Sequence, residues 1–364
     1  MLCAWLGAAF SSGAWADDAL LKCAALHDDG ARLKCYDALA AGQAGTTGTG
    51  SNAATPVLPA APGANAASTE VPAKPVNTAD ASGGTPQRSY LTRAWNLDGR
   101  TGRNHPDRMS PLRPYRQSYL IVRTSDRPNT TPYSPAAGHA VTTPQSLEST
   151  EAKFQFSFKG EIMPYREINW LGFRDFRLWG AYTQQSNWQA FNTRNSSPFR
   201  ETNYEPELIA TFGTGKQEGL KLVNLGIEHQ SNGQSLPQSR SWNRVYLQGG
   251  WEWNDKLSLL ARGWWRIPEN PQQDDNPDIL NYIGRADAVL RWEPDDSQIV
   301  SLLLRNNLNL GQNRGFAQLD WTTPIKLGKS AKLFIQYTDG YGESLIDYNY
   351  RQRTLGVGMA FRDW

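Results

Sequence analysis

The chain of 364 residues contains no run of about 18 apolar residues, yet apolar and polar residues alternate over many short stretches. The clearest stretch is 153–162. Its even-numbered residues are apolar, and its odd-numbered residues, which have the opposite parity, are polar or charged. A strand with this alternation can face lipid on one side and a watery lumen on the other. The 14 tryptophans and 14 tyrosines suit the aromatic girdles of such a protein. The pattern therefore predicts a transmembrane β-barrel.

Twelve segments follow this pattern, and an even strand number is typical of closed bacterial barrels. We therefore expect an all-β fold, a 12-stranded antiparallel transmembrane β-barrel of the outer membrane that occupies residues 89–364. The predicted strands lie near 117–123, 153–162, 176–184, 203–213, 220–231, 242–253, 257–265, 280–292, 298–305, 316–321, 331–338 and 353–361.

Residues 1–16 have the features of a signal peptide. A short apolar stretch ends in Ala-Trp-Ala at Ala16, which is a small-residue cleavage site, and cleavage there would remove Cys3. The positively charged start of a signal peptide is missing, so a translation start further upstream and a non-secretory segment both stay open.

Two different segments are expected between the signal peptide and the barrel. Residues 17–40 have the alanine and leucine spacing of a short helical hairpin, and in an exported chain Cys23 and Cys35 most simply form a disulfide. A redox or metal-binding pair is the alternative, although the spacing fits neither CxxC nor a zinc site. Residues 41–88 are rich in Ala, Gly, Pro, Thr and Ser, which predicts a disordered periplasmic linker.

Polar residues interrupt the apolar face of the predicted strands 220–231 and 242–253. His229 and Ser231 share the apolar parity of the first strand, and Asn243 shares that of the second. If the strands pair with their apolar residues opposed, His229 lies directly opposite Asn243. Residues two apart on a strand stand roughly 6.6 Å apart at the backbone, so Ser231 can reach the other ring nitrogen. Ser231, His229 and Asn243 could therefore act as nucleophile, general base and orienting group. The alternative is that they are simply polar residues at the end of a surface hairpin, without a catalytic role.

Three segments closely resemble the outer membrane phospholipase A family. They are HQSNGQSLPQSRSWNR at 229–244, SSPFRETNYEP at 196–206 and GYGESLIDYN at 340–349. The resemblance implies a serine hydrolase, a phospholipase A1 and A2, that releases fatty acids from sn-1 and sn-2 of phospholipids and from lysophospholipids. It also implies a site in the outer leaflet of the Gram-negative outer membrane, with Ser231 as nucleophile, His229 as base and Asn243 as the orienting residue.

The same resemblance implies calcium as a cofactor. A neutral asparagine cannot offset the charge of an imidazolium, and Ca²⁺ beside the developing oxyanion would supply a positive charge. The implied ligands are the Gln234 carbonyl, the Ser239 hydroxyl, Asp275, and Ser196 from a second subunit. Gln234 replaces the arginine usual in the family, and Leu236 replaces an aspartate, which puts the family's secondary calcium site in doubt.

The expected partners are phospholipid, the outer membrane and, in the active form, a second copy of the chain. Gln184 has the outward parity of the predicted third strand, where an unpaired carboxamide would be costly. The resemblance implies a homodimer, and we expect Gln184 at its interface. The formal charge of +2 gives no indication of nucleic acid as a partner.

Two non-enzymatic alternatives belong to different classes. A porin or structural barrel would keep its polar groups in the lumen, whereas His229, Ser231 and Asn243 share lipid-facing parity. A periplasmic binding module tethered to a barrel would place the function in residues 17–40, a segment that is too small for a binding cleft. The sequence contains no GxSxG, HExxH or GxxxxGK[ST] motif, which argues against soluble hydrolases and nucleotide enzymes.

Overall fold

The computed structural model describes residues 88–97, 112–295, 297–325 and 331–361, and residues 25, 28, 30–32, 34 and 35. Of the N-terminal predictions, the signal peptide, nearly all of the linker and Cys23 lie outside the described residues. Cys35 is in helical backbone and is disulfide-bonded, but its pairing with Cys23 stays a prediction. None of the helices among these residues combines the length and the apolar character needed to cross a membrane.

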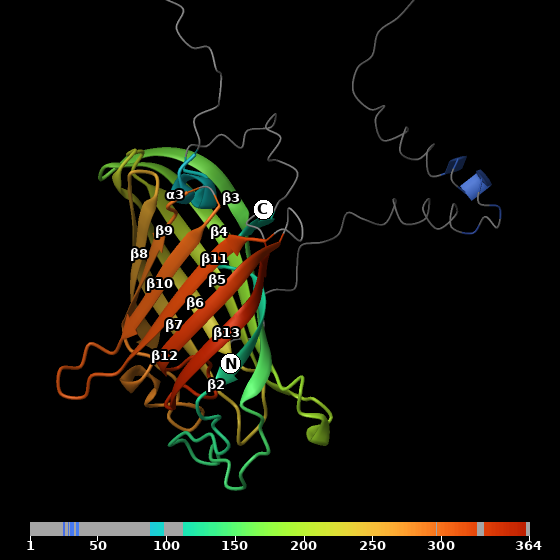
Figure 1. The fold of residues 1–364 in the computed structure, drawn as a ribbon. Helices are drawn as coiled ribbons and strands as arrows, with labels where there is room; N and C mark the ends of the chain where they lie inside the picture. The colour runs from blue at the N-terminus through green and yellow to red at the C-terminus, as the bar shows by residue number, and fades with distance from the viewer. Residues whose placement is uncertain are drawn as a thin grey trace, which may run out of the picture. The chain divides into compact units, whose positions relative to one another are not determined.

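Twelve antiparallel strands form a closed barrel (Figure 1). Each strand pairs with the next along the chain, and the last strand, β13, pairs with β2 and closes the ring. The predicted number of strands and the fold class are therefore confirmed. The barrel strands are β2 (Tyr119–Ser125), β3 (Thr150–Trp170), β4 (Phe173–Trp188), β5 (Phe199–Gly213), β6 (Gly219–Ser231), β7 (Ser241–Trp253), β8 (Leu257–Ile267), β9 (Ala286–Trp292), β10 (Ile299–Asn306), β11 (Gly315–Pro324), β12 (Ala331–Tyr341) and β13 (Arg351–Phe361).

Several predicted strand boundaries differ from the structure, and the largest differences, in β3 and β9, have physical causes. β3 extends well beyond 153–162, because register shifts after Glu161 break the parity while its pairing with β4 continues, and β4 itself extends a few residues past each end of 176–184. The predicted strand 280–292 begins only at Ala286, because Ile279–Asn281 form the 3-10 helix η3 instead. Ile279 is fully buried there, so its apolar character reflects loop packing rather than a strand.

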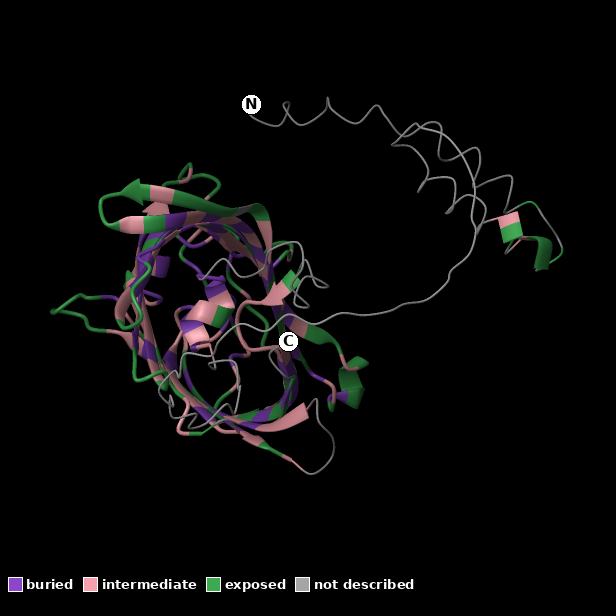
Figure 2. Ribbon diagram, turned by 90° about the horizontal axis from the view of Figure 1, so that it is seen from above, coloured by how far each residue is buried: buried purple, intermediate pink, exposed green. Residues whose placement is uncertain are grey.

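The lumen is filled partly by the segment that precedes the barrel. The helix α3 (Tyr90–Trp95) lies within the ring of strands when the barrel is viewed along its axis (Figure 2). Trp95 packs edge-on against Trp179 of β4, and the Leu91 amide donates a 2.9 Å hydrogen bond to Glu252. The short strand β1 (Leu112–Pro114) pairs with β3 and follows α3. A cavity of about 1150 Å³ remains beside these elements.

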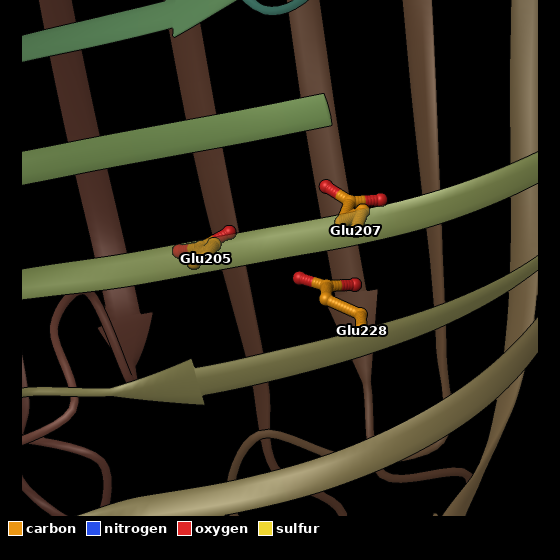
Figure 3. Close-up of side chains that lie close together, drawn as sticks. All are labelled: Glu205, Glu207 and Glu228. Atoms are coloured by element: carbon orange, nitrogen blue, oxygen red, sulfur yellow. The ribbon is translucent and has the colours of Figure 1, made fainter. Parts of the chain in front are cut away.

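Buried ion pairs occupy another part of the lumen. Glu205 and Glu207 of β5 and Glu228 of β6 point toward one another (Figure 3), and their carboxylate oxygens lie within 4.8 Å. Arginines surround them: Arg116 Nη2 lies 2.8 Å from Glu207, and Arg262 Nη1 lies 3.0 Å from Glu228. Because arginine cations already neutralise these carboxylates, the cluster is a structural network rather than a metal site.

The connections at the two ends of the barrel differ in length. Short turns at 171–172, 214–218 and 254–256 join strands at one end, and long loops such as 126–149 and 268–285 join them at the other. Outer membrane barrels have short periplasmic turns and long extracellular loops. β6 ends at Ser231 on the side of the long loops, which is the extracellular side.

Candidate active site

The hairpin of β6 and β7 has the register that the apolar parity predicted. Leu225 lies opposite Leu247, and His229 lies opposite Asn243. Both leucines are 49% exposed on the outer surface, so this face of the hairpin meets lipid. A one-residue slip would move these leucines into the polar lumen, and the lipid therefore sets the register. His229, Asn243 and Ser231 are half-buried at the extracellular end of the same face.

The contact between His229 and Asn243 selects the histidine tautomer. His229 Nδ1 lies 2.9 Å from Asn243 Oδ1. Because an amide oxygen only accepts, Nδ1 must carry the proton, and Nε2 is left as an acceptor. The Ser231 hydroxyl, two residues along the same face, makes no hydrogen bond within the described part of the chain. The structure thus brings the three predicted residues together, with the base and its orienting group in contact.

Glu269 also belongs to this site and was missed from the sequence. Asn243 Nδ2 donates a 2.9 Å hydrogen bond to Glu269 Oε1, so both ends of the Asn243 amide are engaged. Burial raises the pKa of the Glu269 carboxyl, and the hydrogen bond from Asn243 opposes this shift. Glu269 lies two residues beyond Ile267, the β8 residue that pairs with Asn243. Parity counted past the end of the strand could have identified it.

Two of the predicted calcium ligands touch each other. The Ser239 hydroxyl donates a 2.7 Å hydrogen bond to Asp275 Oδ2, and Ser241 lies 3.3 Å from the same oxygen. The other carboxylate oxygen, Oδ1, lies 3.0 Å from His139 Nε2. The sequence indicated nothing of this contact, because His139 lies in the long loop between β2 and β3, where no periodicity applies.

The other two predicted ligands lie in different loops. Gln234 donates through its side chain to the Arg200 carbonyl at 2.9 Å, and its own carbonyl accepts no hydrogen bond from the described residues. A backbone carbonyl in this state can act as a ligand. Ser196 is exposed in the loop between β4 and β5, and it makes no hydrogen bond to Ser239 or Asp275 among the described residues. Leu236 is 62% exposed and offers no oxygen from its side chain.

Gln184 lies on the outer face of β4, as its parity predicted. Its amide has partners on its own strand, since Tyr182 donates a 3.0 Å hydrogen bond to Gln184 Oε1 and Gln184 Nε2 lies 3.4 Å from Ser186 Oγ. Contrary to the expectation from the sequence, the outward carboxamide of Gln184 therefore does not need a second barrel to supply its hydrogen bonds. The place of Gln184 at a dimer interface stays a prediction.

The closed barrel and the polar cluster on its outer surface define an outer membrane barrel with a candidate hydrolytic site that faces lipid. Residues 91–361 match the model of the phospholipase A1 family. The phospholipase A1 of Escherichia coli strain K12 is 38% identical over 256 residues, which cover 69% of this chain and 82% of that protein. A protein of Neisseria meningitidis serogroup B is 36% identical, and the match covers 94% of this chain and 91% of that protein.

Solved structures agree with the sequence matches. The dimer of Salmonella typhi outer membrane phospholipase with bound calcium has a TM-score of 0.60 and 32% identity, and the match covers 74% of this chain and 97% of that chain. An active-site mutant of Escherichia coli outer membrane phospholipase A has a TM-score of 0.62 and 31% identity, and the match covers 75% of this chain and 99% of that chain. The chain belongs to the phospholipase A1 family. It is a phospholipase of the Gram-negative outer membrane, and the predicted fold, phospholipase activity and outer-membrane localisation are confirmed.

Proposed function

We propose that this phospholipase hydrolyses sn-1 and sn-2 acyl esters with Ser231 as nucleophile, His229 as general base and Asn243 as the residue that orients His229. The 2.9 Å contact between His229 Nδ1 and Asn243 Oδ1 carries this proposal. In this arrangement His229 Nε2 carries no proton, and it lies on the same outer face of β6 as Ser231. The ring can then take the proton of Ser231 as the hydroxyl oxygen attacks the ester carbonyl.

The reaction then proceeds in two steps. Attack by Ser231 Oγ forms an acyl-enzyme, and His229 Nε2 passes the proton to the departing glycerol oxygen. In the second step His229 takes a proton from water as the water oxygen attacks the acyl ester, and it then gives this proton to the departing Ser231 Oγ, which releases the fatty acid and restores the free serine. Lysophospholipids carry the same ester and fit the same scheme.

The outer surface beside the proposed nucleophile suits an acyl chain. Leu225, Ile227 and Leu247 are each nearly half exposed and lie further along the same face, toward the middle of the membrane. A phospholipid in the outer leaflet would place its acyl chains along these side chains, with its ester near Ser231 at the extracellular end. The substrate can therefore reach the site without entering the lumen.

Calcium is the proposed cofactor, supported by the calcium bound in the Salmonella typhi structure. The residues present fit this ion, because Ser239 and Asp275 converge to 2.7 Å and the Gln234 carbonyl accepts no hydrogen bond from the described residues. Hydroxyl, carboxylate and carbonyl oxygens are the ligands that Ca²⁺ prefers. When bound, the ion would supply positive charge for the developing oxyanion. The Leu236 side chain contributes no oxygen, so we propose one such site rather than two.

The active form is proposed to be a homodimer, as the Salmonella typhi structure is a dimer. Ser196 lies exposed on a loop and makes no hydrogen bond to Ser239 or Asp275 of its own chain within the described residues. A second copy could therefore supply this hydroxyl to complete the calcium shell. Gln184, on the outer face of β4, would lie at the interface, and separated monomers would stay inactive.

The polar lumen has a structural role in this account. Buried ion pairs and α3 occupy the interior, and the polar residues of the proposed triad all lie outside. The position of these residues on the outer surface favours the hydrolase over the porin alternative.

Replacement of Ser231 by alanine tests the proposal. We expect Ser231→Ala to abolish phospholipid hydrolysis while the folded barrel keeps its heat-modifiable migration on gels, because one surface hydroxyl contributes little to stability. Substantial hydrolysis by a folded Ser231→Ala variant would reject Ser231 as the nucleophile.

A further inference from the structure

The loop that follows β8 brings a carboxylate into contact with the proposed triad. Glu269 Oε1 accepts a 2.9 Å hydrogen bond from Asn243 Nδ2, while Oδ1 of the same amide lies 2.9 Å from His229 Nδ1. We infer that Glu269 is a positioning residue that holds the Asn243 amide with its oxygen toward His229. This inference rests on the proposed triad and extends it by one residue.

An amide in this position needs such a partner because its two ends are similar in shape. A rotation of about 180° would exchange Oδ1 and Nδ2 and leave the overall fit nearly unchanged. The rotated amide would present a donor to His229 Nδ1, which favours the tautomer with its proton on Nε2. In that tautomer Nε2 could not accept the proton of Ser231.

A carboxylate selects one of these two orientations. An ionised Glu269 only accepts hydrogen bonds, so only the Nδ2 end of Asn243 can face it favourably. The hydrogen bond is charge-assisted and therefore stronger than one between neutral groups. The carboxylate also places a negative charge on the far side of an amide that cannot itself offset an imidazolium.

The fold holds Glu269 in place. Val245 of β7 pairs with Trp265 of β8, and Asn243 pairs with Ile267. Glu269 lies two residues after Ile267 and therefore continues the row of outward-facing residues. The Glu269 side chain is 18% exposed, and Arg266 lies 3.8 Å from its second oxygen. This partly buried setting restrains the carboxylate beside Asn243 and limits competition from water.

The anchor of the loop is Arg266. Its Nη2 lies 2.6 Å from Asp274 Oδ1, and its Nη1 lies 3.2 Å from the Asn276 carbonyl. These bonds tie the loop after β8 to the end of the strand. Glu269 therefore reaches Asn243 from a loop that is fixed on both sides of it.

Steady-state kinetics of three variants test the role of Glu269. We expect Glu269→Ala to lower kcat about tenfold with KM unchanged, as expected for a residue that orients a catalytic group. Glu269→Gln can offer Asn243 either a donor or an acceptor, so it no longer selects one orientation of the amide and should be nearly as slow as Glu269→Ala. Gln272→Ala is the matched control, because its side chain is exposed in the same loop and should leave kcat unchanged.

A double-mutant cycle separates positioning from a general effect on the loop. Without the Asn243 amide there is nothing for Glu269 to orient, so Glu269→Ala should cause no further loss in an Asn243→Ala background. An equal loss of kcat in both backgrounds would overturn the inference. Full activity of Glu269→Ala, or of Glu269→Gln, would also overturn it.

Ser231→Ala, assayed beside these variants, distinguishes two kinds of failure. A folded and active Ser231→Ala variant would reject the triad itself. An inactive Ser231→Ala variant together with a fully active Glu269→Ala variant would reject only the role of Glu269. Heat-modifiable migration confirms in each case that the barrel has folded.

Discussion

Replacement of Asn243 by alanine should slow hydrolysis without abolishing it. The variant keeps the proposed nucleophile, base and calcium ligands, and it loses the 2.9 Å hydrogen bond to His229 Nδ1. During proton transfer the imidazole becomes a cation, so the bond lost in the transition state is one to a charged group. Such bonds contribute about 1.5–3 kcal/mol.

This free energy sets the size of the expected effect. At about 1.4 kcal/mol per tenfold change in rate, the loss of kcat should lie between about 10-fold and 100-fold. The effect should fall on kcat rather than KM, because Asn243 contacts His229 and not the acyl chain.

The assay is hydrolysis of a phospholipid in mixed detergent micelles with saturating Ca²⁺. Ser231→Ala serves as the reference for complete loss, and heat-modifiable migration serves as the control for folding. A loss in Asn243→Ala as large as that in Ser231→Ala would refute the assigned roles. An unchanged kcat would show that Asn243 does not orient the base.

Three further predictions concern the cofactor, the assembly and the lumen. Chelation by EDTA should stop hydrolysis, and Ca²⁺ should restore it far better than Mg²⁺, which keeps a small octahedral shell of water; full activity in excess EDTA would remove calcium from the mechanism. Gln184→Ala should weaken dimerisation in analytical ultracentrifugation with Ca²⁺ and lower activity at limiting protein, and a fully active monomer would reject both this interface and the role of Ser196. Glu228→Leu should lower the free energy of unfolding by about 3–5 kcal/mol in urea titrations, because Arg244 and Arg262 would lose their buried partner; an unchanged midpoint would contradict the structural role of this network.

Much of the barrel and the core of the site could be predicted from periodicity. Lipid on one side and polar lumen on the other make parity decisive, so the pairing of His229 with Asn243 followed from the apolar residues alone. The same reasoning predicted that Gln184 faces outward. It could not show that Tyr182 and Ser186 satisfy the Gln184 amide, because that depends on side-chain rotamers.

The features that were missed lie where periodicity ends. Register shifts after Glu161 hid the full length of β3, and an apolar loop around Ile279 resembled a strand. His139 lies in a loop that follows no repeat, and Glu269 lies two residues past the end of β8, where the alternation was not followed. The outward row of β8 could have indicated Glu269, but the 2.9 Å hydrogen bond to Asn243 depends on a side-chain rotamer that the sequence does not specify.

The most direct test of the central claim is covalent labelling of the folded, detergent-solubilised protein with a sulfonyl fluoride, followed by peptide mass spectrometry. The proposed triad predicts a single modified residue, Ser231, with loss of hydrolysis in proportion to labelling, and much slower labelling of His229→Ala. Complete labelling of a different residue, or full hydrolysis after Ser231 has been modified, would contradict the account.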